Sequence, residues 1–173
     1  MNLFYINIIM DTGDIMFREM LRKKQKLTDD ECKGILINEK RGVLSVIGDE
    51  GYPYAFPINH YYNEADGCLY FHCGKKGHKL DAINNCGKAS FCVYDKGYKK
   101  PESWALNIKS VIVFGKVEII DDGEIIIDIS RKLSYKFTDD EDYIDNEIKK
   151  FAKNTLLLKF TPEHISGKLV NES

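Results

Sequence analysis

The sequence predicts a mainly β (α+β) domain in which about six antiparallel strands close into a small barrel with peripheral helices. Turn-forming residues separate short apolar runs of strand type, and only a few segments have helical spacing. Tyr and Phe, which suit a half-buried pleated surface, occur 10 and 9 times in 173 residues. A chain of this length holds one domain with a proper core, and it has no internal repeat or linker. We therefore expect a single domain.

The composition excludes some classes of protein. A net charge of −2 gives no reason to expect a nucleic-acid partner. The five cysteines are odd in number and none has C-x-x-C spacing, so we expect neither a disulfide framework nor a metal site. Reduced thiols are typical of the cytoplasm, which is the predicted location.

The first nine residues are apolar but lack the cationic segment and the cleavage site of a signal peptide. They are also too few to span a membrane. Met16 is a more natural start, so residues 1–15 are predicted to be an extension and residues 16–173 the domain.

A helix is expected from Thr28 onward, because Thr28 and Glu31 have the spacing of a capping box. Asn38 and Gly42 should end it. The preceding segment, Arg18–Lys26, is basic and compatible with a helix.

Three strands should follow, at residues 43–47, 52–62 and 68–73, joined by turns at residues 48–51 and 63–67. Two consecutive hairpins of this kind predict a meander. The middle strand contains Pro53 and Pro57, and proline cannot donate to a strand ladder. This strand should therefore lie at an edge, or be bulged near Pro57.

The second half should contain a short helix at 79–84, strands at 89–94 and 108–120, helices at 124–137 and 139–153, and a last strand at 155–160. Gly115 is expected to bend the longest strand, 108–120, at a barrel corner. The long segment 95–106 has no period and holds Trp104, which is typical of a functional or mobile loop. On the last helix, the residues expected to face inward are Tyr143, Ile144, Ile148 and Phe151.

The stretch Tyr70–Asp81 passes from a strand through a cationic loop into a helix. Gly74 and Gly77 allow tight turning, and Lys75, Lys76, His78 and Lys79 place positive charge beside free helix N–H groups. Such an arrangement favours a phosphate. The plainer interpretation is a solvated cationic loop, and the segment lacks the spacing of a P-loop.

Four motifs resemble one known family in order and spacing: Gly51–Asn59, Leu69–Lys79, Ala89–Val93 and Lys109–Val117. From Met16 to Lys168 the chain is similar to the pyridoxamine 5′-phosphate oxidase-related, FMN-binding split-barrel family. Within it, the chain looks most like the nitroimidazole-resistance (Nim-type) flavoproteins. The resemblance implies a six-stranded antiparallel split β-barrel with peripheral helices.

The resemblance also implies where FMN is held. The strand segment that matches the edge of the isoalloxazine ring consists of Pro57, Ile58, Asn59 and His60. The phosphate would meet His78 and Lys79, and the residues of the long strand that contribute to it would be Lys109 and Ser110.

His72 matches the histidine beside the flavin ring and is the predicted catalytic residue, as a proton donor to reduced substrate. An isolated strand histidine is more often structural, and that interpretation stays open. Trp104 lies in the loop that, in this family, reaches over the partner subunit's cofactor. The family is homodimeric, with FMN at the subunit interface.

The predicted function is therefore an FMN-dependent reductase acting on a small planar electrophile such as a nitroimidazole. No arginine follows Arg131, whereas pyridoxamine 5′-phosphate oxidase itself holds its substrate with an Arg- and Trp-rich C-terminal segment. Oxidation of vitamin B6 is therefore not expected. The alternatives are a non-catalytic carrier or sensor that binds flavin or haem, and a structural barrel without a ligand.

Overall fold

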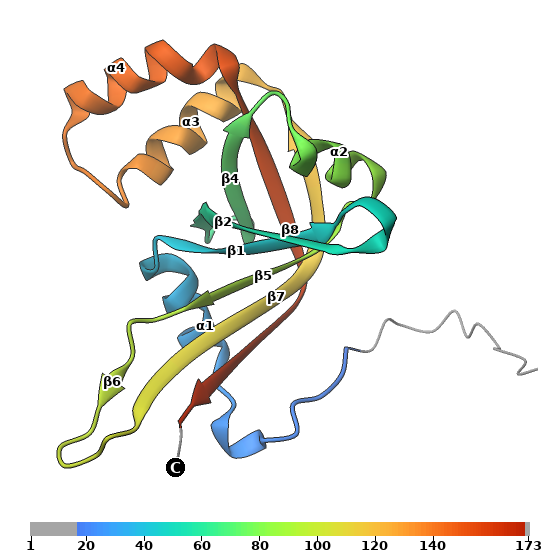
Figure 1. The fold of residues 1–173 in the computed structure, drawn as a ribbon. Helices are drawn as coiled ribbons and strands as arrows, with labels where there is room; N and C mark the ends of the chain where they lie inside the picture. Colours follow the sequence, from blue (N-terminus) through green and yellow to red (C-terminus); the bar gives the residue numbers. More distant parts are fainter. Residues whose placement is uncertain (1–16, 172–173) are drawn as a thin grey trace, which may run out of the picture.

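The chain forms one antiparallel sheet that curls into a half-barrel, with helices around it (Figure 1). The computed structural model describes residues 17–171, so the predicted extension over residues 1–15 lies outside the described residues. The strands are β1 (Arg41–Ile47), β2 (Pro53–Asn59), β3 (Tyr61–Asn63), β4 (Cys68–Gly74), β5 (Lys88–Tyr94), β6 (Tyr98–Lys99), β7 (Leu106–Ile120) and β8 (Thr155–Val170). The α-helices are α1 (Asp29–Asn38), α2 (His78–Asn85), α3 (Gly123–Ser134) and α4 (Glu141–Phe151).

The strand order β2-β1-β5-β7-β8-β4-β3 confirms the split barrel. In the described residues this order contains seven strands rather than the predicted six, and their connections also differ from the prediction. The predicted strand 52–62 is two strands, β2 and β3, which follow each other in the chain but lie at opposite ends of the sheet. At His60 the chain passes from one edge of the sheet to the other. The predicted meander is therefore wrong, because β3 pairs with β4 and not with β2. This crossing brings β2 close to β4, so the sheet curls back on itself.

Strand β2 is an edge strand, as its prolines predict. It pairs with β1 alone, and the register is regular from Ile47↔Pro53 to Arg41↔Asn59. Of the two predicted alternatives, the edge position is the one observed, and the register shows no bulge near Pro57. At an edge, a proline can turn its nitrogen away from the ladder, so no bulge is needed.

The bend predicted at Gly115 is confirmed, since the β7–β8 register shifts between Phe114 and Gly115. Strand β8 continues ten residues past the predicted end at Phe160. Pro162 and Gly167 hid this continuation from a pattern-based prediction. Pro162 is tolerated because it lies at the register shift, opposite Gly115.

The main core lies between the inner face of the sheet and α1. Its fully buried side chains include Leu36, Leu44, Phe71, Phe91 and Phe160. Helix α1 begins as predicted: Glu31 N donates to Thr28 Oγ1 at 3.2 Å, and Thr28 N donates to Glu31 Oε2 at 2.9 Å. The capping box fixes where the helix starts and hence which of its faces covers the sheet.

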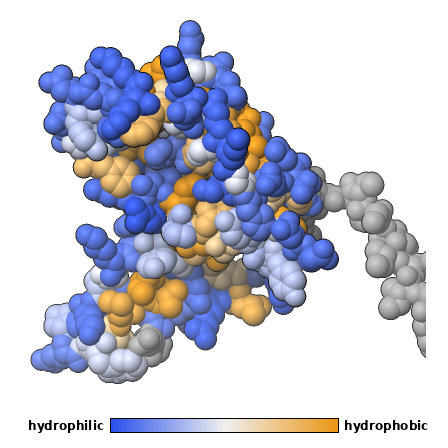
Figure 2. All heavy atoms as spheres, turned by 45° about the horizontal axis from the view of Figure 1, so that its top comes forward, coloured by the Kyte–Doolittle hydropathy of each residue, from blue (hydrophilic) through white to orange (hydrophobic). Residues whose placement is uncertain are grey.

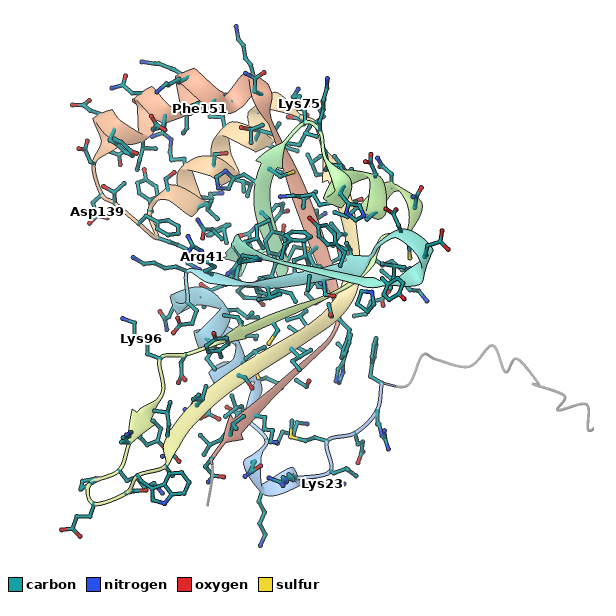
Figure 3. All side chains as sticks on the ribbon, viewed as in Figure 1. Lys23, Arg41, Lys75, Lys96, Asp139 and Phe151 are labelled. Atoms are coloured by element: carbon teal, nitrogen blue, oxygen red, sulfur yellow. The ribbon has the colours of Figure 1, made fainter. Side chains whose placement is uncertain are left out.

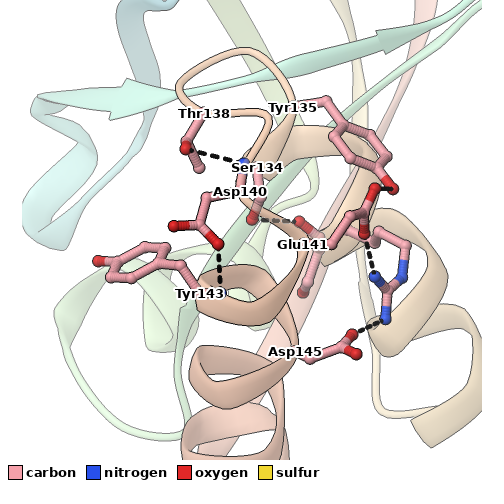
Figure 4. Close-up of polar contacts among 9 residues, drawn as sticks. Ser134, Tyr135, Thr138, Asp140, Glu141, Tyr143 and Asp145 are labelled. Atoms are coloured by element: carbon pink, nitrogen blue, oxygen red, sulfur yellow. Dashed lines mark hydrogen bonds and ion pairs between the residues drawn. The ribbon is translucent and has the colours of Figure 1, made fainter.

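Helices α3 and α4 form a hairpin on the side of β4 and β3. Arg131 of α3 joins it together, donating to Glu141 Oε2 at 3.1 Å and pairing with Asp145 (Figure 4). Tyr135 Oη donates to Glu141 Oε1 at 2.8 Å. Only Ile144 of α4 is buried. Tyr143 and Phe151, which were predicted to face inward, are exposed and do not belong to the core.

Within the described residues, every helix is too short or too polar to cross a membrane. All five cysteines are free thiols. Over the same residues, no cluster of three or more His, Cys, Asp or Glu side chains could hold a metal ion.

Candidate functional site

The start of α2 is held against the edge strand β2. The His78 ring stacks on Tyr54, with ring centroids 4.3 Å apart, and Lys79 Nζ lies 4.9 Å from the centre of the Phe56 ring. His78 Nε2 is also 3.4 Å from Asp49 Oδ2 in the β1–β2 turn. These contacts bring His78 and Lys79, predicted from the sequence as a pair, to one end of the predicted ring-binding strand.

Helix α2 begins without a side-chain cap. Its N-cap residue is Gly77, which has φ +130°, and a Cβ at this position would meet nothing within 4 Å. Such a φ strongly favours glycine. Uncapped N–H groups, the Lys79 ammonium and the His78 ring therefore share an open site, the combination that binds an anion.

Of the ring-binding segment, Pro57 is exposed, Asn59 is half-buried and Ile58 is buried. The Asn59 side chain accepts a hydrogen bond from Arg41 Nε at 2.8 Å. As an edge strand, β2 leaves backbone N–H and C=O groups on one side without a neighbouring strand in the described part of the chain. Such groups could hydrogen-bond the edge of a planar ring.

His60 has a different environment from the rest of that segment. The residue is fully buried, its Nε2 donates to Leu36 O at 2.8 Å, and its ring packs edge-on against Phe91. Burial lowers its pKa to about 3, and the nearby charge of Lys136 contributes to the shift. The structure places His60 in the core, and its role as a cofactor contact stays a prediction.

His72 lies on the outer face of β4, beneath the α3–α4 hairpin, where it lines a cavity of about 220 Å³. Desolvation lowers its pKa below the usual 6.5, and the positive charge of Lys79 lowers it further. Its imidazole is therefore largely neutral near pH 7. The influence of Lys79 also indicates that the predicted proton donor and the predicted phosphate site are electrostatic neighbours.

Lys109 and Ser110 lie far from the start of α2 in the same chain. Ser110 pairs with Tyr94 at one end of β5, whereas α2 leads into the other end, where Lys88 pairs with Lys116. Six residues of strand separate Ser110 from Lys116, or about 20 Å. In Figure 3, Lys96 marks the Tyr94 end of β5, and Lys75 marks the loop between β4 and α2.

Lys109 and Ser110 also face opposite sides of the sheet, as neighbours in a strand must. Lys109 Nζ bonds Glu31 Oε1 of α1 at 2.8 Å, on the helix-covered side. Ser110 Oγ approaches Lys168 O at 3.5 Å. One chain therefore does not bring Lys109 and Ser110 together with Lys79.

Trp104 is 75% exposed on the arm formed by β6 and the adjoining end of β7. Other large side chains exposed on this arm are Tyr98 and Leu106, with Val170 of β8 close by. Figure 2 shows hydrophobic side chains gathered on this projecting lobe. The arm extends away from its own barrel, so Trp104 and the start of α2 lie at opposite ends of the molecule.

A second apolar surface was not predicted: the outer sheet face. It follows from the register, since residues opposite each other in antiparallel strands share a face. One row across β2, β1, β5, β7 and β8 consists of Pro57, Val43, Cys92, Ile112 and Ser166. Ile112 and Phe114 are each 40% exposed there. Alternation on 108–120 alone could have shown which β7 residues face outward.

The comparison with family models matches residues 28–169 to the pyridoxamine 5′-phosphate oxidase family. No curated protein matches the chain.

Solved structures confirm the fold. A putative 5-nitroimidazole antibiotic resistance protein from Bacteroides thetaiotaomicron has a TM-score of 0.70 at 21% identity, over 84% of this chain and 87% of that one. A conserved hypothetical protein from Mycobacterium tuberculosis has a TM-score of 0.74 at 14% identity, over 87% and 90%. An FAD- and haem-binding protein from Mycobacterium smegmatis has a TM-score of 0.67 at 21% identity, over 87% and 74%. With a family model matched over most of its length and these structural relatives, the chain belongs to the pyridoxamine 5′-phosphate oxidase family.

Proposed function

We propose that this protein is an FMN-dependent reductase of small planar electrophiles, such as nitroaromatic compounds. The observation that carries the proposal is the pairing of an open, cationic helix start with an edge strand. His78 and Lys79 are held against Tyr54 and Phe56 of β2. In a member of this family, this arrangement supports an anion site beside a strand with free backbone groups.

The residues present fit a phosphorylated flavin. Lys79 and the N–H groups that follow Gly77 suit a phosphate dianion. The unpaired edge of β2, near Pro57, suits the polar rim of a flat ring system. When bound, FMN supplies the electron-transfer chemistry. The protein's part is to bind, to orient and to supply protons.

The group proposed to move a proton is His72. Its neutral imidazole would offer one ring N–H as a hydrogen-bond donor to a bound substrate. Because its pKa is lowered, the protonated form becomes abundant only below pH 6.5. Proton donation by His72 would therefore favour mildly acidic conditions.

Relatives support the substrate class. The protein from Bacteroides thetaiotaomicron is described as a putative 5-nitroimidazole resistance protein, and another structural relative is an F420 reductase with a TM-score of 0.55. The relative that binds FAD and haem keeps a carrier function open as the second candidate. Oxidation of reduced flavin by a nitroimidazole would distinguish an enzyme from a carrier.

Replacing both His78 and Lys79 with alanine should release the flavin. Each charge-assisted contact to phosphate contributes about 1.5–3 kcal/mol, so the double variant should bind FMN at least 100-fold more weakly. Absorbance near 450 nm after gel filtration measures retention. Lys75→Ala is the matched control, because Lys75 already pairs with Asp121 at 3.1 Å. Undiminished FMN binding by the double variant would refute the phosphate site.

The complete site is proposed to need a homodimer. The outer sheet face offers exposed apolar side chains around Ile112 and Phe114. In an isologous dimer, the end of the sheet that carries Ser110 in one subunit can lie against the end beside the α2 start in the other. This would bring Ser110 and Trp104 of one subunit towards the α2 start of its partner.

The variant Ile112→Asp should therefore convert dimer to monomer and reduce FMN retention together. A charge buried in a dimer interface without a partner costs several kcal/mol. Sedimentation velocity with detection at 280 and 450 nm measures both properties at once. Glu118→Asp, a conservative change further along the same strand, is the control. A variant that stays dimeric with FMN bound would show that the outer sheet face is not the interface.

A further inference from the structure

The α3–α4 hairpin and β4 enclose a pocket whose wall on α4 is an aromatic–acidic–aromatic stripe. Tyr143, Glu147 and Phe151 occur at i, i+4 and i+8, so they lie on one face of the helix. His72 forms the opposite wall. The remaining lining consists of Ser130, Leu133, Ser134, Ile148, Ala152 and Thr155.

The volume restricts what can enter. The cavity measures about 220 Å³. Sites for drug-sized ligands occupy about 300–1,000 Å³, so this pocket suits a molecule smaller than those. A flavin is too large for it. The pocket is therefore distinct from the volume needed for the cofactor, and of the predicted site residues only His72 lines it.

The electrostatic character comes from Glu147. Two neighbouring acidic groups of the hairpin, Glu141 and Asp145, are bound to Arg131 (Figure 4). Within the described residues, Glu147 has one ion pair, a long 3.9 Å contact with Lys150 Nζ. That carboxylate therefore keeps most of its capacity to accept hydrogen bonds.

Lys150 shows what kind of group this position attracts. Its ammonium lies 3.9 Å from the Glu147 carboxylate and 4.8 Å from the centre of the Phe151 ring. A carboxylate together with an aromatic face is a recurrent arrangement for binding organic cations. The Lys150 side chain is 67% exposed, so it can move away at little cost.

The α4 wall is positioned before any ligand arrives. The Arg131 ion pairs and the bond from Tyr135 to Glu141 fix α4 against α3. Asp140 Oδ1 caps the helix by accepting from Tyr143 N at 3.0 Å. Figure 3 shows the exposed side chains along α4, with Asp139 before its start and Phe151 at its end. Such preorganisation reduces the entropy lost on binding.

We propose that this pocket binds a small organic cation, an arylalkylamine or an amidine, with its positive group between Glu147 and the rings of Tyr143 and Phe151. The flat part of the ligand would lie towards His72. The inference deepens the proposed function, on which it rests for one point only: that such a cation, when it also carries a reducible group such as a nitro group, is the substrate. Binding itself requires no flavin.

The test is an NMR titration of the whole chain with benzylamine, using benzyl alcohol and benzoate as neutral and anionic probes of similar shape. Benzylamine should bind at least 10-fold more tightly than benzyl alcohol, and benzoate more weakly still. Shift changes should centre on Thr155 and the His72 ring. Equal binding of the three probes, or shift changes elsewhere, would overturn the proposal.

Two variants with opposite expected effects complete the test. Glu147→Gln should abolish the preference for benzylamine over benzyl alcohol. Lys150→Gln removes the competing ammonium and should strengthen benzylamine binding several-fold. If α4 had a purely structural role, both substitutions would change the affinity for benzylamine in the same direction. Thermal unfolding checks that both variants are folded, since both positions are on the surface of α4.

Repeating the titration with and without added FMN separates this inference from the proposed function. A protein that takes up no FMN but still selects benzylamine would refute the reductase and leave the pocket intact. A protein that binds FMN but does not select benzylamine would refute the pocket and leave the proposed function intact.

Discussion

Acidification from pH 7 to pH 4 should destabilise this protein by about 3 kcal/mol through His60 alone. The residue is fully buried and its pKa is lowered to about 3, from 6.5 for an exposed histidine. The unfolded chain therefore binds one proton more than the folded chain between these two values. Stability is fully present above pH 6.5 and falls by about 1.4 kcal/mol per unit as the pH drops towards 3.

The surroundings of His60 explain why its ring stays neutral. Nε2 donates to Leu36 O, so Nε2 carries the hydrogen and Nδ1 has only a lone pair. Nδ1 is buried without a hydrogen-bond partner in the described structure. Protonation would place an unpaired N–H and a positive charge there. Lys136, whose Nζ is 3.4 Å from the same carbonyl oxygen, adds repulsion.

The measurement is the urea unfolding free energy of the wild type and of His60→Phe at intervals between pH 4 and pH 7. Phenylalanine keeps a flat ring against Phe91 but cannot titrate. The variant will be less stable at pH 7, since Leu36 O loses a donor, but its stability should vary much less with pH. Parallel curves for the two proteins would disprove the linkage. The His60 ring resonances, followed by NMR, should remain those of a neutral imidazole down to pH 4.

His60 also shows where reasoning from the sequence fails. The segment Pro57–His60 reads as one strand, because nothing in it interrupts the pattern. In the structure the chain leaves β2 at Asn59 and starts β3 at Tyr61, on the opposite edge of the sheet. A change of edge is a property of barrel closure, which depends on contacts between residues far apart in the chain.

Features with local causes were predictable. The capping box of Thr28 and Glu31 defines the start of α1, and the glycine and cations at 74–79 define the turn into α2. By contrast, the alternation of side chains along a strand already implied that Lys109 and Ser110 face opposite sides of the sheet. Both were nevertheless assigned to the phosphate site, because they are adjacent in the motif. The pocket could not be foreseen, because the stripe of Glu147 becomes a wall only when Arg131 fixes the angle of α4.

The substitution Gly115→Ala should destabilise the fold by more than 3 kcal/mol, at the top of the range for overpacking in a core. A Cβ at this position would lie well inside contact distance of the Thr161 carbonyl oxygen and 3.0 Å from Phe160 Cε1. The obstacle is the backbone of β8, which pairs with β7 on both sides of the register shift. Such a backbone cannot move aside without breaking the longest ladder of the sheet.

Gly34→Ala is the matched control, because it makes the same chemical change in open space. Gly34 lies inside α1 and a Cβ there would meet nothing within 4 Å. Alanine should therefore stabilise the protein by about 0.5–1 kcal/mol through helix propensity. Urea unfolding of the two variants should give shifts of opposite sign. If Gly115→Ala were as stable as the wild type, β7 and β8 would have to be able to move apart at Gly115. The close approach of these two strands would then not be the cause of the bend in the barrel.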